Sequence, residues 1–420
     1  MTGGTTYILG AGLAGLSCAV RLAQAGRAAA LYEAAGHAGG RCRSFYDDGL
    51  GRRIDNGNHL LLSGNRDAFD YLTLIGASES LTGPDEALFP FVDLQTGERW
   101  TVHPNARVFP WWIFDSARRV PETAAGDYLE ELRLAWAGQG ARITECLDSN
   151  GVLFRRLWEP LAVSALNTAA SEGAASLLWP VIRETFGRGG AACKPRVARQ
   201  GLSESFIDPA LSRLAGAGIG VRFKARVRAL EFSNDRLAAF TVGEDRIVLT
   251  DRDAAVLAVP PSVAGDLVPG LAVPTESRAI VNGHFRLPAP CAAESFIGVI
   301  GGLCQWIFCR GDVVSTTVSA ADASVDLPAD EIAQTMWREI VTVLELPAQP
   351  VPPHRIVKEK RATFAQTPAQ VALRPKSRTA WKNFYLAGDW TDTGLPATIE
   401  GAVRSGRLAA EGVLRFVSNS

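Results

Sequence analysis

The stretch TTYILGAGLAGLSCAVRLAQAGRAAALYE, residues 5–33, decides the fold. It begins with an apolar, β-rich run at 5–9, which is followed by a glycine-rich turn at 10–15. Apolar residues then recur with helical spacing over 16–24, and a second apolar run covers 28–32. This order predicts a strand, a tight turn, a helix and a second strand within about thirty residues. We therefore expect an α/β fold built on a parallel sheet.

The turn has the spacing Gly10-x-Gly12-x-x-Gly15, in which glycines let the backbone turn tightly and approach a pyrophosphate closely. The helix that follows offers unpaired N–H groups and a positive dipole end to the phosphates. Glu33 ends the next strand, where a carboxylate can accept hydrogen bonds from ribose hydroxyls and disfavours a 2′-phosphate. We predict a Rossmann-like dinucleotide site with the following residues: Gly10, Gly12, Leu13, Ala14, Gly15, Glu33 and Ala34.

Composition limits the classes of protein that the chain can belong to. Its 420 residues are 47% apolar and 21% charged, which is ordinary for a soluble globular protein of two or three domains. A net charge of -1 gives no general attraction for nucleic acid. Seven scattered cysteines without a C-x-x-C pair favour reduced thiols and no metal site. Because no signal peptide or spanning segment is found, we expect a cytoplasmic protein, with contact to the inner face of the cell membrane left open.

Tryptophan is unevenly distributed, with none before residue 100 and none between 180 and 305. This pattern predicts two kinds of domain. The predicted bounds are 1–85, 196–270 and 375–420 for a discontinuous dinucleotide-binding domain, and 86–195 and 271–374 for a mixed α+β substrate domain. The periodicity predicts helices at 126–148, 151–165, 174–186, 328–346 and 399–417, and antiparallel strands over 278–320.

A second glycine element, Gly39-Gly40-Arg41, follows the first. Its glycines allow close approach of a ligand, and its arginine can neutralise a phosphate. Residues 10–44 thereby resemble the FAD-binding start of the flavin amine oxidase superfamily, which includes phytoene desaturases and protoporphyrinogen oxidases. The resemblance implies an amine-oxidase-like fold and bound FAD. The cysteine motif for covalent attachment is absent from the sequence, so we expect the FAD to be non-covalent.

Later segments resemble the same superfamily. Residues 384–390 look like its closing strand, which approaches the pyrophosphate and ribityl parts of FAD. The helix from residue 399 looks like the one whose N–H groups can stabilise the negative charge of reduced flavin. Residues 226–228 resemble the element that reads the adenine. The resemblance adds these residues to the expected FAD site: Gly39, Gly40, Arg41, Gly57, Asn58, His59, Val227, Gly388, Asp389, Thr398 and Ile399.

Three strings, at 55–62, 157–168 and 387–402, resemble more narrowly the hydroxysqualene dehydroxylase family, FAD enzymes of bacterial squalene and hopanoid biosynthesis. Asn58 departs from this resemblance, since we would expect Gln there. The resemblance implies an oxidoreductase that converts hydroxysqualene to squalene and water with hydride from reduced flavin. It also implies a functional link to squalene-synthase-like enzymes of terpenoid metabolism. The alternative is a carotenoid-type desaturase that acts on a C30 isoprenoid.

Loss of a hydroxyl requires a proton donor, because hydroxide is a poor leaving group. His59 is the first candidate, since its loop should pass the flavin ring; its alternative role is to order that loop. Asp392 is another candidate, and it could equally cap the final turn. Asn167 could bind the substrate hydroxyl or only a backbone amide.

Glu159 is the remaining candidate for proton transfer. It lies between Trp158 and Pro160, where an apolar setting could raise its pKa. Its alternative is an ion pair with Arg155 or Arg156.

The Trp-rich block can supply the walls of an apolar chamber for a C30 chain, although tryptophans also serve as ordinary core. Within it, Phe109-Pro110-Trp111-Trp112-Ile113-Phe114 is the best candidate for contact with a membrane, because aromatic side chains favour the bilayer interface. A buried corner of the substrate domain is the alternative.

Overall fold

The computed structural model describes residues 4–291 and 295–418. One end of the molecule is built on a five-stranded parallel sheet in the order β10-β2-β1-β14-β20. Its strands are β1 (Thr6–Leu9), β2 (Ala29–Tyr32), β10 (Val221–Arg222), β14 (Ala254–Leu257) and β20 (Phe384–Leu386). Strands from the beginning, middle and end of the chain therefore form one sheet, as the predicted α/β fold with a discontinuous Rossmann-like unit requires.

Alternate residues of the parallel strands face two different layers. Ile8 and Val256 face a cluster formed with four helices, whereas Leu9 and Leu257 face the other side. The helices are α1 (Leu13–Gln24), α2 (Arg66–Leu74), α6 (Asp208–Gly216) and α10 (Ile399–Ser418). The other side is covered by an antiparallel sheet of β11 (Val227–Ser233), β12 (Arg236–Val242) and β13 (Asp245–Val248), and by α7 (Pro261–Leu267). Burial on both faces explains why these strands are almost wholly apolar.

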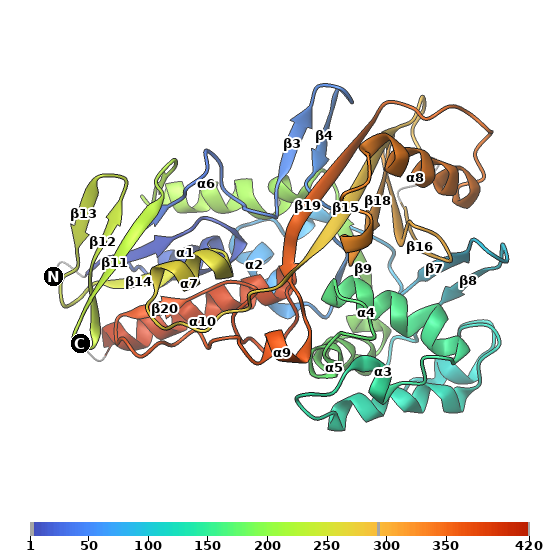
Figure 1. Cartoon of the computed structure of the whole chain (residues 1–420), viewed down its shortest axis with the longest axis horizontal. Coiled ribbons are helices and arrows are strands. Elements are labelled where there is room, and N and C mark those ends of the chain that lie inside the picture. Colours follow the sequence, from blue (N-terminus) through green and yellow to red (C-terminus); the bar gives the residue numbers. More distant parts are fainter. Residues whose placement is uncertain (1–3, 292–294, 419–420) are drawn as a thin grey trace.

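The other end contains a seven-stranded mixed sheet in the order β19-β15-β18-β17-β16-β7-β8. Its strands are β7 (Phe89–Asp93), β8 (Arg99–Val102), β15 (Ser277–Arg286), β16 (Ser295–Ile300), β17 (Trp306–Arg310), β18 (Val313–Val318) and β19 (His354–Phe364). α8 (Ala329–Val343) covers one face, and α3 (Ile143–Cys146), α4 (Glu159–Leu166) and α5 (Ala175–Glu184) form a helical layer on the other. Figure 1 shows α8 above this sheet and the helical layer below it.

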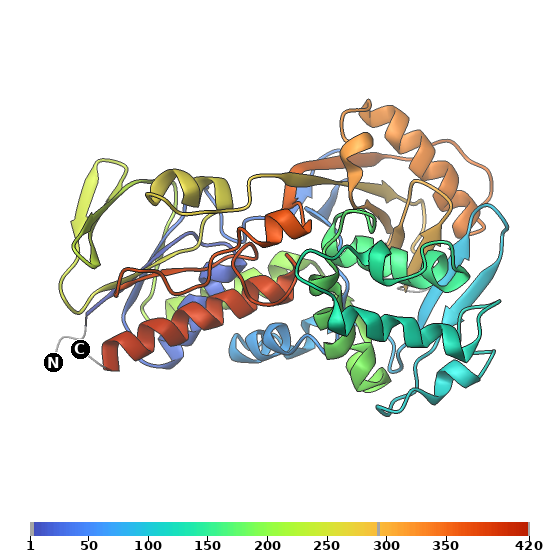
Figure 2. The same cartoon turned by 60° about the horizontal axis from the view of Figure 1, so that its bottom comes forward.

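Smaller elements connect the two ends. They are the hairpin β3 (Ser44–Asp47) and β4 (Arg52–Asp55), the short sheet β5 (Leu61–Leu62), β9 (Pro195–Ala198) and β6 (Leu81–Thr82), and α9 (Pro368–Val371). In both views α10 runs from the chain termini towards the middle of the molecule, so that its first turn lies where the two ends meet (Figures 1 and 2).

The predicted helices at 328–346 and 399–417 are confirmed as α8 and α10. The predicted helix at 126–148 is wrong. The structure has a 3-10 helix at Ala125–Trp136 and the short α3, because Gly138 and Gly140 interrupt the chain between them. The helix predicted at 151–165 contains a π-helical turn at Phe154–Trp158 before α4. The helix predicted at 174–186 is α5. The predicted residue bounds of the two domains stay a prediction.

Candidate active site

The glycine-rich turn between β1 and α1 presents a helix N-terminus to a ligand. A Cβ at Gly10 or Gly15 would overlap a backbone carbonyl, that of Ala258 or of Gly10, so the turn itself requires glycine there. A Cβ at Gly12 would meet no atom of the described residues within 4 Å, so this side of the turn is open. Within α1 the first turn has neither a side-chain cap nor an acidic residue. Leu13 and Ala14 thus offer free helix-terminal N–H groups, an arrangement that fits a pyrophosphate.

Glu33 is fixed against this turn by both carboxylate oxygens. Oε2 accepts a hydrogen bond from Ala11 N at 2.8 Å, and Oε1 accepts one from Ala35 N at 2.8 Å. Each oxygen keeps a second lone pair that could accept from a ribose hydroxyl. Ala225 N donates to Glu33 O at 2.8 Å, which brings the start of β11 at Val227 to the same edge.

The second glycine element packs directly on the first. Gly39 N donates to Ala11 O at 2.9 Å, and a Cβ at Gly40 would lie 3.5 Å from Gly12 Cα. Arg41 reaches the far end of the chain, where its Nη2 lies 2.7 Å from Asp389 Oδ1. Three segments that are distant in sequence, expected to hold FAD, are therefore adjacent in space.

The closing loop after β20 is held by contacts that the sequence did not reveal. A Cβ at Gly388 would overlap the indole of Trp390, and Gly388 N donates to Ser405 Oγ at 2.8 Å. The buried Arg374 donates to the carbonyls of Asp389, Trp390 and Thr391. Burial lowers the pKa of Arg374 to about 10, although the negative charges of Asp392 and Asp389 oppose this lowering. No motif marked Arg374, because its role depends only on which carbonyls the fold brings to it.

The first turn of α10 is anchored by a local cap and by a charged network. Thr398 Oγ1 accepts from Gly401 N at 3.1 Å, and Ile399 is buried beside it. The carboxylate of Glu400 accepts from Asp67 N at 3.0 Å and from Ala68 N at 2.8 Å, at the start of α2.

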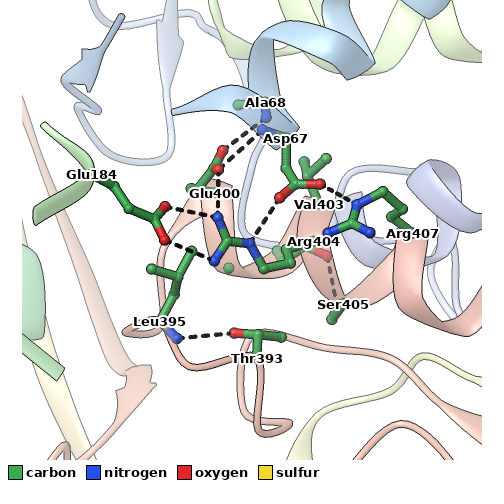
Figure 3. A network of polar contacts seen from close by, with 12 residues as sticks. Asp67, Ala68, Glu184, Thr393, Leu395, Glu400, Val403, Arg404, Ser405 and Arg407 are labelled. Atoms are coloured by element: carbon green, nitrogen blue, oxygen red, sulfur yellow. Dashed lines mark hydrogen bonds and ion pairs between the residues drawn. The ribbon is translucent and has the colours of Figure 1, made fainter. Parts of the chain in front are cut away.

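Arg404, one turn further along α10, joins three carboxylates (Figure 3). Its guanidinium lies 2.8 Å from Asp67, 2.8 Å from Glu184 and 3.3 Å from Glu400. Glu184 is the last residue of α5, so this network ties the helix expected to face the flavin to the helical layer of the other end. Burial raises the pKa of Glu400 to about 7, although the two backbone N–H groups and Arg404 oppose that rise.

His59 lies at a small cavity next to a buried ion pair. Asp55 is 5% exposed on its side chain, and its Oδ2 lies 2.7 Å from Arg310 Nη1. The cavity measures about 40 Å³ and is lined by Asp55, His59, Phe308, Arg310 and others. Burial lowers the pKa of His59, and the negative charge of Asp55 partly opposes this.

The segment before His59 is tied to the mixed sheet by side-chain hydrogen bonds. Asn58 Nδ2 donates to Thr317 Oγ1 at 3.0 Å, and Asn282 Nδ2 donates to Asn56 O at 3.3 Å. Gly57 packs against the amide of Asn282, since a Cβ there would lie 3.2 Å from Asn282 Nδ2. The loop expected to pass the flavin is therefore held against β15 and β18.

The structure does not place the other three candidates for catalysis at this cavity. Asn167 is buried, and its amide bonds to Ala320 N, Thr363 Oγ1 and the carbonyl of Arg278. Its side chain thus binds the protein itself, which matches the structural alternative. Asp392 is exposed and accepts from Gly394 N at 3.3 Å, as a turn cap does.

Glu159 is exposed at the start of α4. Its partial desolvation raises its pKa, in the direction expected, while Arg155 lowers it. The suggested ion pair with Arg156 is wrong, because that guanidinium instead lies 2.6 Å from Glu98. Arg155 donates to Asn150 O.

The sequence reasoning also missed Glu131. In a 3-10 helix, residues three apart share a face, so Glu131 lies in line with the buried Tyr128 and Leu134. No ion-pair or hydrogen-bond partner of its carboxyl is found in residues 4–291 and 295–418. Burial raises the pKa of Glu131 to about 8.

Comparison with known proteins places the chain in a family. Residues 13–414 match the family of flavin containing amine oxidoreductases. A hydroxysqualene dehydroxylase from Rhodopseudomonas palustris is 48% identical over 98% of this chain and 98% of the relative. One from Sinorhizobium fredii is 46% identical, over 96% of this chain and 97% of the relative. The chain belongs to the hydroxysqualene dehydroxylase family.

More distant matches agree with this fold. An oxidoreductase from Methanosarcina mazei has a TM-score of 0.71 at 14% identity and covers 98% of this chain and all of its own. A 15-cis-phytoene desaturase from an Oncidium hybrid is only 23% identical, over 97% of this chain and 77% of the relative. As a member of the hydroxysqualene dehydroxylase family, the chain is a flavin-dependent oxidoreductase of the amine oxidase superfamily. Among its described helices, none is long and apolar enough to cross a bilayer.

Proposed function

We propose that this protein reduces hydroxysqualene to squalene and water, with non-covalent FAD as its cofactor. The observation that carries the proposal is the identity of 44–48% to three hydroxysqualene dehydroxylases over nearly the whole chain. Desaturation is the second candidate, favoured by desaturase relatives that are 21–23% identical over 97% of the chain.

The segments that meet around the glycine turn would hold FAD. The proposed residues are Gly10, Gly12, Leu13, Ala14, Gly15, Glu33, Ala34, Gly39, Gly40, Arg41, Gly57, Asn58, His59, Val227, Gly388, Asp389, Thr398 and Ile399. When bound and reduced, FAD supplies the hydride. The N-terminus of α10 would favour negative charge beside it, because the helix dipole is positive there.

His59 is the proposed proton donor at the departing hydroxyl. Its cavity and the adjacent Asp55 support this role, whereas Asn167 is occupied by structural hydrogen bonds and neither Glu159 nor Asp392, both exposed, lines the cavity. Burial lowers the pKa of His59 and so favours the neutral imidazole, which means that the donor would be the smaller protonated fraction, a stronger acid than a free imidazolium. The aromatic layer formed by Trp158, Trp306 and their neighbours would exclude water, which would otherwise capture an allylic cation.

The proposed substrate is a long isoprenoid alcohol that dissolves in lipid. We therefore place the protein in the cytoplasm, at the inner face of the cell membrane and next to squalene-synthase-like enzymes that would supply the substrate.

The test is anaerobic incubation of the reduced protein with hydroxysqualene. We expect flavin reoxidation to match the squalene formed, one for one. A control incubates the oxidised protein with squalene. Formation of dehydrosqualene in that control, with no reoxidation by hydroxysqualene, would favour the desaturase instead.

A further inference from the structure

Exposed apolar side chains are concentrated in one part of the molecule. Of the eleven large apolar side chains exposed among the described residues, seven fall within residues 108–136. Trp136 is 80% exposed, Phe109 67% and Phe114 64%. The group that we call the apolar platform comprises Phe109, Trp111 and Phe114 from the first segment and Leu129, Leu132 and Trp136 from the second. Because the two segments pack against each other, such a concentration favours an interaction surface over ordinary scattered exposure.

The first segment is held rigidly with these side chains outward. Asn105 is buried, and its Nδ2 donates to the carbonyls of Arg107 at 2.9 Å and Phe109 at 3.0 Å. Its Oδ1 accepts from Trp112 N at 3.2 Å, while Trp112 itself is buried. Gly190 N further donates to Asn105 O at 2.7 Å. The exposed residues therefore lie on a well-ordered turn, and their exposure does not result from fraying.

The second segment is packed against the first. The rings of Trp112 and Tyr128 meet edge to face at 5.1 Å, and Tyr128 Oη accepts from Val120 N at 2.9 Å. Since residues three apart share a face of the 3-10 helix, Tyr128 is directed inward while Leu129 and Leu132 share an outward face. In Figure 2 these segments lie at the end of the molecule opposite the two termini.

The charges beside the first segment suit lipid headgroups. Residues 105–119 contain Arg107, Arg118 and Arg119 against the single acid Asp115, which lies 3.7 Å from Arg118. The second segment carries Asp127, Glu130 and Glu131 against Arg133, so the cationic side of the platform is the first segment. The guanidinium of Arg118 lies 4.8 Å from the ring centroid of Trp111. Tryptophan together with arginine is the composition that favours the bilayer interface, where the ring enters the headgroup region and the cation meets phosphates.

We propose that the apolar platform docks the protein onto the surface of an anionic lipid bilayer. This inference rests on the proposed function, because a lipid-dissolved substrate must be collected from the bilayer. The platform belongs to the same helical layer as α5, so docking would bring the substrate half of the molecule to the lipid.

The test measures sedimentation of the FAD-loaded protein with vesicles of phosphatidylcholine and phosphatidylglycerol. The triple variant Phe109→Ser, Phe114→Ser, Trp136→Ser removes three aromatic anchors. We expect its partition constant to fall about 1,000-fold, since each of the three aromatic side chains contributes about tenfold. Vesicles of phosphatidylcholine alone should bind the unaltered protein several-fold more weakly.

A matched triple variant, Tyr46→Ser, Val248→Ser, Leu327→Ser, removes exposed apolar side chains elsewhere. It should bind vesicles within about twofold of the unaltered protein. Turnover of hydroxysqualene in detergent separates the two proposals. The platform variant should turn over hydroxysqualene in detergent as the unaltered protein does, and should lose turnover of substrate carried in vesicles. If the unaltered protein does not turn over hydroxysqualene in detergent, only the proposed function is refuted.

Three results would overturn the docking proposal. The first is failure of the unaltered protein to bind vesicles. The second is binding of the platform variant that equals that of the unaltered protein. Sedimentation equilibrium could instead reveal a dimer that the platform variant abolishes, which would identify the occupant as a second copy of this chain.

Discussion

Replacing Arg404 by Met should destabilise the protein in a way that depends on pH. The guanidinium bridges Asp67, Glu184 and Glu400, whose side chains are 7%, 16% and 5% exposed. Removing one partner of a buried ion pair typically costs about 3–5 kcal/mol, because the remaining charge is left uncompensated. Arg407 still neutralises Asp67, so we expect the lower end, about 3 kcal/mol at pH 8.

The pH dependence follows from Glu400. Its pKa is already raised to about 7 by burial, and loss of Arg404 should raise it further. A carboxyl with a raised pKa in the folded state stabilises that state at low pH and loses this contribution as pH rises through that pKa. Protonation of Glu400 below pH 7 therefore removes part of the uncompensated charge in the Arg404→Met variant. The loss in free energy of unfolding relative to the unaltered protein should shrink to about half at pH 6.

Urea unfolding of the FAD-loaded protein at pH 6 and pH 8 checks this. Arg183→Met is the matched control, because Arg183 is 59% exposed and lies 3.5 Å from the same Glu184. It should cost less than about 0.5 kcal/mol. Glu184→Gln in the Arg404→Met background should recover part of the loss. A loss below about 1 kcal/mol at pH 8, or one independent of pH, would refute the reasoning.

Three further predictions follow from single groups. Burial raises the pKa of Glu131 to about 8, so the folded state loses stability as pH rises through that value; Glu131→Gln should remove this dependence and be about 2 kcal/mol more stable at pH 9, and an unchanged urea profile would contradict it. Glu33→Gln weakens the carboxylate that binds Ala11 N and should reduce FAD affinity about tenfold, measured by fluorescence titration of the apoprotein; equal affinity would exclude a role in binding. His59→Asn should slow flavin reoxidation by hydroxysqualene about 100-fold and flatten its pH profile, whereas Glu159→Gln should change it less than threefold; the reverse order would reassign the proton donor.

The sequence predicted well those parts of the fold that depend on local spacing. The turn at Gly10 needs a positive φ of 119°, and the adjoining β1, α1 and β2 follow from runs of a few residues. α8 and α10 were likewise predicted to within three residues, because each has a long apolar stripe. The family motifs also brought together segments as distant as Arg41 and Asp389, which no periodicity relates.

Contacts that depend on tertiary packing could not be predicted from spacing. Asp67 and Arg404 are 337 residues apart, and neither belongs to a recognised binding pattern. Arg374 and Glu131 are single charged residues in ordinary sequence, and only the fold reveals that Arg374 binds three carbonyls while Glu131 is half-buried in line with Tyr128 and Leu134. The 3-10 helix at Ala125–Trp136 has amphipathic spacing that a regular helix would share, so its period was misjudged.

Asn167 illustrates why a string that identifies a family need not identify its chemistry. The residue adopts a left-handed conformation with φ 46° at the end of α4, and its amide joins α4 to the mixed sheet. A string can therefore be diagnostic because it fixes packing. Among the candidates for proton transfer, this criterion sets aside Asn167, while Glu159 and Asp392 are exposed and do not line the cavity beside Asp55. His59 remains, since it lines a cavity beside the Asp55–Arg310 ion pair and adjoins the loop held by Asn58. His59 is therefore the residue that we propose as the proton donor.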